Sequence, residues 1–262
     1  MRIETRSDMR RWNIIAFIAI IGAFSLLGTL LLQSLAGDWD WSKPWQYREA
    51  LLRGWGTTVL LSCGAMVGSV LVGLLLMMGQ RSPLPAVKWT CRLFLEFVRD
   101  TPLLVQLLIG YFVIFAPLMA RPLNDIGWDD KIIIGMILLS LFEGAYLGEI
   151  FRGGVDSIPK AQWESARAAG LDRGQIYRHV IFPQALRRVL PAVAGQAVSL
   201  IKDSSLLSVI GVQEFAYQAR VYTSQTYGGL EAYVPLAVGY LLLTAPVAFL
   251  SHRLERRYRD ET

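Results

Sequence analysis

The stretch TTVLLSCGAMVGSVLVGLLLMM, residues 57–78, decides the fold class of this chain. It contains no charged residue, and it matches the ~20 residues that an α-helix needs to cross a bilayer. Further apolar runs begin at Trp12, Pro102, Ile132, Leu190 and Tyr233. We therefore expect an all-α integral membrane protein with about six transmembrane helices.

The composition supports this class. The 262 residues are 53% hydrophobic and 18% charged, whereas soluble proteins average roughly 45–50% apolar and about 25% charged residues. Cys63 lies inside the quoted run and Cys91 beyond it in a basic loop, so the two thiols are expected at different depths and unpaired.

Basic residues set the expected orientation, because Lys and Arg near span ends stay in the cytoplasm. Nineteen lie in segments that we predict to be internal, against six in external segments, and Lys202 falls in a span. Both termini are therefore predicted to be cytoplasmic, and the formal charge of +5 requires no nucleic-acid partner. The internal residues are Arg2, Arg6, Arg10, Arg11, Arg81, Lys88, Arg92, Arg99, Arg152, Lys160, Arg167, Arg173, Arg178, Arg187, Arg188, Arg253, Arg256, Arg257 and Arg259.

The first apolar run has an alternative interpretation as a secretory signal peptide, because Ser34-Leu35-Ala36 resembles a small-residue cleavage site. Its apolar stretch, Ile14 to Leu32, exceeds the ~7–15 residues usual in such signals. A retained membrane anchor is the favoured interpretation.

The longest predicted internal loop, from about Phe151 to Pro191, should contain short helices. Ser157 can cap the first helix, Pro159 suits its first turn, and Gly170 ends it. Physics alone leaves two interpretations open, a solvated amphipathic loop and a docking element.

A second short helix should follow in the same loop. Asp172, with Gln175 three residues on, has the spacing of a capping box. Pro183 is expected to stop this helix, and Pro191 suits the opening of the fifth span.

The sequence Glu164-Ser165-Ala166-Arg167-Ala168-Ala169-Gly170, followed by Ile181-Phe182-Pro183, resembles the EAA loop of ATP-binding cassette (ABC) importer permeases. The resemblance implies a coupling helix that sits in a groove of an ATPase subunit. Glu164 would then be the motif acid, Ala166 the small contact residue and Gly170 the turn. Ser165 departs from the usual Ala, and Phe182 from a Leu often found before Pro183.

Three further stretches are similar to polar amino-acid permeases of this family, with Asp100 and Gly148 departing from common Gly and Ala. The resemblance covers roughly Gly54 to the C-terminus and implies a type I ABC importer permease-like fold. We predict residues 1–53 to be a cytoplasmic N-terminus, an added first helix and an external loop, and 54–262 to be the permease domain, with the coupling loop near 157–183. The three stretches are 96–106, 145–160 and 202–207.

The resemblance implies a permease subunit that translocates polar amino acids, working with two ATPase subunits, a second permease copy or paralogue, and an extracytoplasmic amino-acid-binding protein. The shared motifs leave open which amino acid is carried and whether the permease pair is identical. No Gly-x-x-x-x-Gly-Lys-[Ser/Thr] loop occurs, so ATP hydrolysis is assigned to a partner. His179 and His252 lie apart without a ligand cluster, and we expect neither metal nor cofactor.

Four charged residues fall in the spans, where a central charge costs about 2.5–3.5 kcal/mol on insertion scales. They should face protein or a water-filled path, and they are candidates for the translocation path: Glu143, Glu149, Lys202 and Asp203. A structural role is the alternative for three of them. Glu149 can reach Arg152 one turn on, and Lys202 and Asp203 can pair with neighbouring segments. Proton-coupled transport by these acids is a rival hypothesis, but the expected inverted repeat is not seen.

Two smaller features complete the candidate sites. Glu143 adjoins the motif Gly144-x-x-x-Gly148, which predicts a crowded helix interface. Arg99 and Thr101 precede the third span, where Thr101 can cap the helix, and they are candidates for gating.

Overall fold

The computed structural model describes residues 6–34 and 42–259, with side chains at 15–30 and 42–258. The chain divides into two compact units, Met1–Lys43 and Pro44–Thr262. The first unit contains α1, Arg6–Ser34, whose described side chains are almost all exposed. The predicted cleavage site and the four N-terminal arginines fall outside the described side chains.

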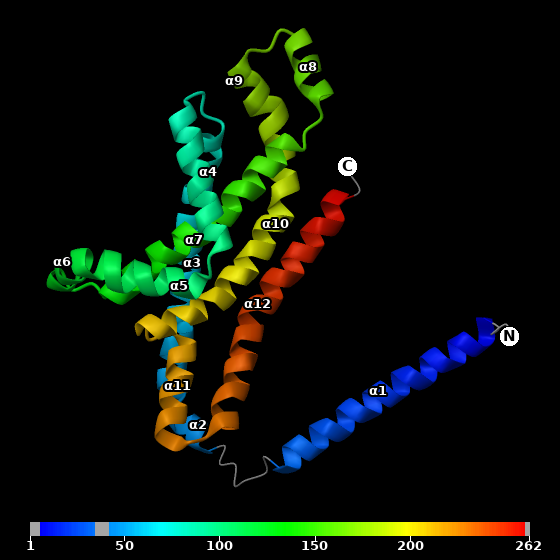
Figure 1. Ribbon diagram of the computed structural model, residues 1–262, viewed down its shortest axis with the longest axis vertical. Coiled ribbons are helices and arrows are strands. Elements are labelled where there is room, and N and C mark those ends of the chain that lie inside the picture. Colours follow the sequence, from blue (N-terminus) through cyan, green and yellow to red (C-terminus); the bar gives the residue numbers. More distant parts are fainter. Residues whose placement is uncertain (1–5, 35–41, 260–262) are drawn as a thin grey trace. The chain divides into compact units, whose positions relative to one another are not determined.

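Five helical stretches of the second unit are long and apolar enough to cross a membrane (Figure 1). They coincide with five of the six predicted spans, and the sixth falls in α1, where the described apolar part is Ile15–Leu30. The described residues form helices and connections without a strand, so the all-α prediction is confirmed. The stretches are α3 (Arg48–Gln80), α5 to α6 (Leu103–Asp125), α7 (Asp130–Asp156), α9 to η3 (Arg173–Ile210), and α12 (Gly229–Arg259) up to Tyr258.

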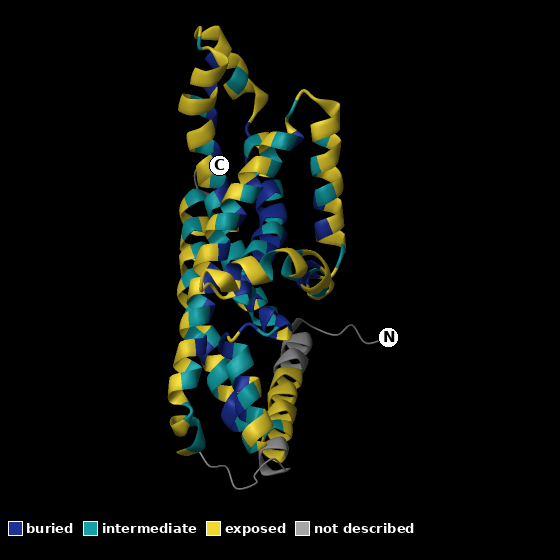
Figure 2. Cartoon of the chain, turned by 90° about the vertical axis from the view of Figure 1, so that its left-hand side faces the viewer, coloured by how far each residue is buried: buried dark blue, intermediate teal, exposed yellow. Residues whose placement is uncertain are grey.

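The seam between α3 and α7 is the most extensive helix contact in the second unit, and glycines make its close packing possible. A Cβ on Gly144 would lie 2.6 Å from the Cβ of Val72, and one on Gly148 would lie 3.2 Å from the Cβ of Leu76. The predicted crowded interface at Gly144-x-x-x-Gly148 is therefore confirmed. Around this seam gather the buried residues, coloured dark blue in Figure 2, that form the main core.

Between α3 and α5 lies α4, Pro85–Asp100, an amphipathic helix where the sequence suggested a basic loop. Thr101 ends α4, and its Oγ1 donates a hydrogen bond to the carbonyl oxygen of Phe97. The predicted capping of the next span by Thr101 is therefore wrong, because Pro102 has extended backbone and itself precedes α5, Leu103–Ile109. The span continues through the π-helix η1, Gly110–Ala120, into α6, Arg121–Asp125.

The predicted helix of the long loop is α8, Lys160–Ala168. Ser157 does not cap it, since Ser157 ends α7 and its Oγ donates to the carbonyl oxygen of Gly154. The second short helix begins as predicted, because Asp172 and Gln175 form the capping box of α9, Arg173–Gln175.

Neither proline after α9 acts as predicted. Pro183 lies in the first turn of α10, Phe182–Asp203, directly after the π-helix η2, Ile176–Ile181. A first-turn proline loses no needed hydrogen bond, so the helix runs on. Pro191 lies inside α10, where membrane helices tolerate proline, and its carbonyl oxygen accepts a hydrogen bond from Ser251 of α12.

The remaining helices complete the other end of the bundle. The 3-10 helix η3, Ser204–Ile210, leads to α11, Phe215–Thr226, which packs against α3 and α12. The short α2, Ser42–Gln46, precedes α3. Tyr47 then packs edge to face on Tyr222 of α11, with ring centroids 5.0 Å apart.

Candidate functional site

Helix α8 projects from the bundle on a loop with a small core of its own (Figure 1). Ala166 is 5% exposed and packs inside this core, while Glu164 and Ser165 beside it are exposed. The small side chain of Ala166 therefore serves packing within the loop, and the exposed face of α8 is made by its neighbours. Together with Ala166, the buried members of this core are Ile158, Ile176, Ile181 and Ala185.

Gly170 ends α8 with a φ of +78°, a left-handed conformation that glycine adopts without strain. The backbone N–H of Leu171 donates to the carbonyl oxygen of Ala166 at 3.2 Å, and the backbone N–H of Gly170 donates to the carbonyl oxygen of Arg167 at 2.9 Å. These two bonds define a Schellman motif. The exit direction of the loop from α8 is therefore fixed by the conformation of one residue.

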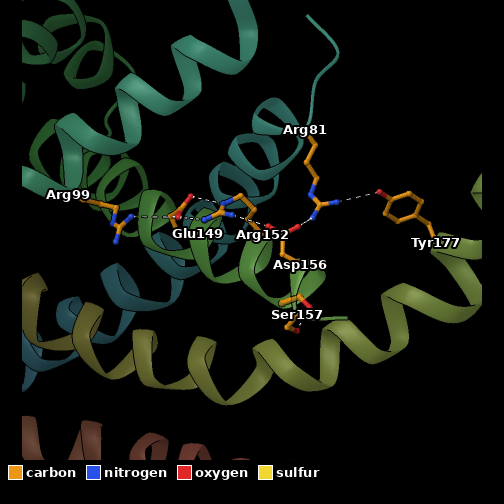
Figure 3. A network of polar contacts seen from close by, with 8 residues as sticks. Arg81, Arg99, Glu149, Arg152, Asp156, Ser157 and Tyr177 are labelled. Carbon is orange, nitrogen blue, oxygen red and sulfur yellow. Dashed lines mark hydrogen bonds and ion pairs between the residues drawn. The ribbon is translucent and has the colours of Figure 1, made fainter. Parts of the chain in front are cut away.

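A chain of contacts joins α8 to the ends of α3 and α7, and Figure 3 shows its part from Tyr177 through Arg81 to Asp156. Trp163 of α8 packs edge to face on Tyr177 of η2, with ring centroids 5.1 Å apart. The hydroxyl of Tyr177 accepts a hydrogen bond from Arg81 Nη1 at 3.4 Å, and Arg81 also pairs with Asp156. Side-chain contacts therefore connect α8 to the ends of α3 and α7.

Near the end of α7 two carboxylates are each contacted by two arginines (Figure 3). Glu149 Oε2 lies 2.8 Å from Arg152 Nη2 and 3.7 Å from Arg99 Nη1. Asp156 Oδ2 lies 2.9 Å from Arg152 Nη1, and the same carboxylate contacts Arg81. Glu149 is thus held in the pair with Arg152 that its sequence spacing favoured, and Arg99 joins the same network.

The break between α4 and α5 is closed by one side chain. The Nε2 of Gln106 donates to Thr101 Oγ1 at 2.8 Å and to the carbonyl oxygen of Val98 at 2.7 Å. Arg99 and Thr101 therefore lie at the same joint, but Arg99 faces the ion pairs while Thr101 faces Gln106. Sequence reasoning gave Gln106 no role because its acceptors are set by the bend, which the sequence did not predict.

Glu143 is completely buried in the middle of α7. Its Oε2 accepts a hydrogen bond from Gln196 of α10, its Oε1 has no hydrogen-bond partner, and the carboxyl of Asp203 interacts with it. Lys202, the residue before Asp203 on α10, is exposed and makes no ion pair among the described residues. The structure therefore brings Glu143 and Asp203 together, leaves Lys202 exposed beside Asp203, and places Glu149 in the arginine network.

A buried carboxylate that sequence reasoning missed, Glu214, joins three helices at the other end of the bundle. It caps α11 by accepting bonds from the backbone N–H groups of Ala216 and Tyr217, at 2.8 and 2.7 Å. It also accepts from Thr58 of α3 and Tyr240 of α12, at 3.3 and 2.8 Å. Burial raises the pKa of Glu214 while these donors lower it. Its only sequence signal is an acid placed directly before a helix.

The fold itself has relatives among solved structures. A structure titled "Crystal structure of an amino acid ABC transporter with histidines" superimposes with a TM-score of 0.73 at 30% identity, covering 84% of this chain and 100% of that one. An inward-facing MetNI methionine ABC transporter shares the fold, with a TM-score of 0.63 at 17% identity. Five membrane-crossing stretches with a projecting loop helix thus define a type I ABC importer permease.

The sequence comparisons give the family. The profile of the binding-protein-dependent transport system inner membrane component matches residues 69–260, and the chain belongs to this family. It is 35% identical to the glutamine transport system permease protein GlnP of Escherichia coli K12, over 85% of this chain and 99% of that protein. It is 31% identical to the probable glutamine ABC transporter permease protein GlnM of Bacillus subtilis 168, over 78% of this chain and 93% of that protein.

Family membership makes this chain a multi-pass inner-membrane transport subunit rather than an enzyme. In such systems separate subunits hydrolyse ATP, and the permease associates with them and with a permease partner.

Proposed function

We propose that this permease translocates polar amino acids into the cell, fed by an extracytoplasmic amino-acid-binding protein and driven by two ATPase subunits. The observation that carries the substrate class is 35% identity over 99% of a glutamine permease. The similarity runs through the spans as well as the loop, so it includes the helices that would surround a substrate.

The coupling role belongs to α8 and its Schellman turn. Glu164 and Ser165 form the exposed face offered to the ATPase, Ala166 seats the helix on the loop core, and Gly170 sets its direction. Pro183 begins the helix that carries the loop back to the membrane. An exposed short helix with a rigid base fits recognition in a groove of a partner.

The translocation path is proposed to run beside the buried polar pair on α7 and α10. Glu143 has an unsatisfied oxygen and lies next to Asp203, so both are the prime candidates to contact a substrate ammonium group. Lys202 offers an exposed cation one residue away. Arg99 and Thr101 are proposed to act at a gate, because both lie at the α4–α5 joint. Glu149, a candidate for the path itself, lies 3.7 Å from Arg99 and would border this gate.

Transport by reconstituted vesicles tests the function. The permease, its ATPase and its binding protein should accumulate a labelled polar amino acid only when ATP is supplied, and the permease alone should hydrolyse no ATP. Leucine serves as the apolar control substrate. Accumulation driven by a proton gradient without the ATPase would instead make the chain a secondary transporter.

The proposed topology places both termini in the cytoplasm and retains the first helix as an anchor, with residues 1–53 as an addition to the permease domain 54–262. Reporter fusions after Gly37 and after Thr262 test it. The expected result is an external reporter at Gly37 and an internal one at Thr262; cleavage after Ala36 or an external C-terminus would contradict this topology.

A further inference from the structure

A cleft with a surplus of positive charge lies between α4 and the adjoining ends of α3 and α7. Its volume is about 470 Å³, which lies within the roughly 300–1,000 Å³ range of small-ligand sites. Five cations and three acids line it, so its net charge is positive. The cations are Arg81, Lys88, Arg92, Arg99 and Arg152, and the acids are Glu96, Glu149 and Asp156.

The ion pairs leave two of these cations unpaired. Glu149 and Asp156 are both taken up by arginines of the network described above. Lys88 and Arg92 have no carboxylate within ion-pair distance among the described residues, although Glu96 lies one turn beyond Arg92 on the same helix. The part of the cleft along the first half of α4 therefore has the charge that suits an anion.

An apolar stripe runs beside the cations on α4. Trp89, Leu93 and Phe97 follow one another at a spacing of four residues, so they form one face of the helix. Their exposed fractions are 61%, 59% and 63%. Each of them directly follows a charged residue of the cleft: Lys88, Arg92 or Glu96. The apolar stripe therefore lies about a quarter turn around α4 from these charged residues.

We propose that this cleft and stripe bind an anionic phospholipid, with the phosphate between Lys88 and Arg92 and an acyl chain along Trp89, Leu93 and Phe97. A free phosphate would use only the cations, and a neutral lipid would use only the stripe, whereas an anionic lipid uses both. The lipid lies in the cytoplasmic leaflet if the proposed topology holds. Anionic lipids of that leaflet attract basic residues at the surface.

Lipid binding to the purified permease–ATPase complex tests the proposal. Phosphatidylglycerol and phosphatidylcholine with identical acyl chains are titrated separately, and bound lipid is counted by native mass spectrometry. The double variant Lys88→Gln/Arg92→Gln should weaken phosphatidylglycerol binding by about 25-fold, which is about fivefold for each cation at ~1 kcal/mol per basic residue. Binding of phosphatidylcholine should stay unchanged.

Two further variants test the contribution of charge, one away from the cleft and one inside it. Arg256→Gln/Arg257→Gln removes the same charge from exposed positions on α12 and should leave phosphatidylglycerol binding unchanged. Glu96→Gln removes the acid one helical turn beyond Arg92 and should strengthen phosphatidylglycerol binding by up to about fivefold, since it removes one negative charge from the cleft.

Three outcomes would overturn the proposal. The first is an equal loss of lipid binding in the α12 control pair, which would mean a general charge effect. In the second, inorganic phosphate alone saturates the site and displaces phosphatidylglycerol, so that the ligand is a free anion. The third is lipid binding that appears only after the ATPase is removed, because the cleft would then belong to the ATPase interface. None of these measurements depends on the transported substrate.

Discussion

The seam between α3 and α7 and the loop around α8 both depend on glycine, but for different physical reasons. At Gly144 in the seam, a Cβ would lie 2.6 Å from Val72, whereas at Gly170 in the loop nothing lies within 4 Å of the added atom. Gly170 instead has a φ of +78°. The seam therefore excludes any side chain by volume, and the loop excludes L side chains by backbone conformation.

This difference explains why the two regions are suited to different tasks. The seam is suited to holding α3 and α7 together as one unit, because neither helix can move away from the other without opening a void. The loop keeps an exposed helix in one orientation through a single turn and a small core. This comparison is tested by substitutions that distinguish the effect of side-chain volume in the seam from the effect of backbone conformation in the loop.

The largest effect is expected from Gly144→Val. Overpacking a dense core usually costs about 1–3 kcal/mol, and here the clash is with a Cβ close to the α3 backbone, so the cost should reach the upper end of that range or exceed it. Thermal unfolding of the detergent-solubilised permease should shift strongly downward. Gly153→Ala in the same helix is the control, because it has open space and should be neutral. Equal destabilisation by both would refute the volume argument.

A smaller and local effect is expected from Gly170→Val. The left-handed conformation costs an L residue roughly 1–2 kcal/mol, and the surroundings offer no clash. The membrane core should unfold at the wild-type temperature while ATPase association or transport-linked hydrolysis is lost. Gly170→Asn, which tolerates this conformation better, should retain most of the activity. Wild-type transport by the Val variant would show that the orientation of α8 is irrelevant.

Glu164→Lys should leave the fold intact, since exposed substitutions usually change stability by no more than about 0.5 kcal/mol. It reverses the charge on the face proposed to meet the ATPase, so association should slow and become more sensitive to salt. Binding kinetics at two ionic strengths measure this. Lys160→Glu, an exposed reversal of opposite sign at the start of α8, shows whether the sign of the charge matters. Unchanged kinetics in both variants would make α8 a solvated loop.

The smallest effect is expected from Tyr177→Phe. It removes the 3.4 Å contact with Arg81 but keeps the ring against Trp163, and Arg81 retains its pair with Asp156. The stability change should stay below about 0.5 kcal/mol, because the contact is exposed. Tyr177→Ala should reduce transport-linked ATP hydrolysis more strongly, since it also removes the ring. Equal losses in the two variants would assign the link to the hydroxyl.

The features that the sequence predicted correctly depend on local information. Span length, the Gly144-x-x-x-Gly148 spacing and the capping box at Asp172 can each be recognised within a few turns of helix. Gly170 was recognised as a helix end for the same reason. The family resemblance also rests on contiguous motifs, so it can be recognised without any knowledge of tertiary packing.

The features that were missed depend on distant residues or on helix continuity. Pro183 was expected to stop a helix, but the wide turns of η2 lead directly into α10. Glu214 reaches Thr58, 156 residues away, and that pairing leaves no trace in the local sequence. Thr101 was placed at the start of a span because the bend before α5 was not foreseen.

Arginine sharing at the end of α7 gives the carboxylate of Asp156 two cationic partners, Arg81 and Arg152. Arg152 contacts both Glu149 and Asp156, so Asp156 can part from Arg81 and still have a partner. These side chains are partly exposed, so the loss of one arginine costs Asp156 little while the other arginine remains. The network therefore secures its carboxylates more than its arginines: if Arg81 moves away, Asp156 keeps Arg152, whereas Arg81 keeps only the hydroxyl of Tyr177 among the described residues.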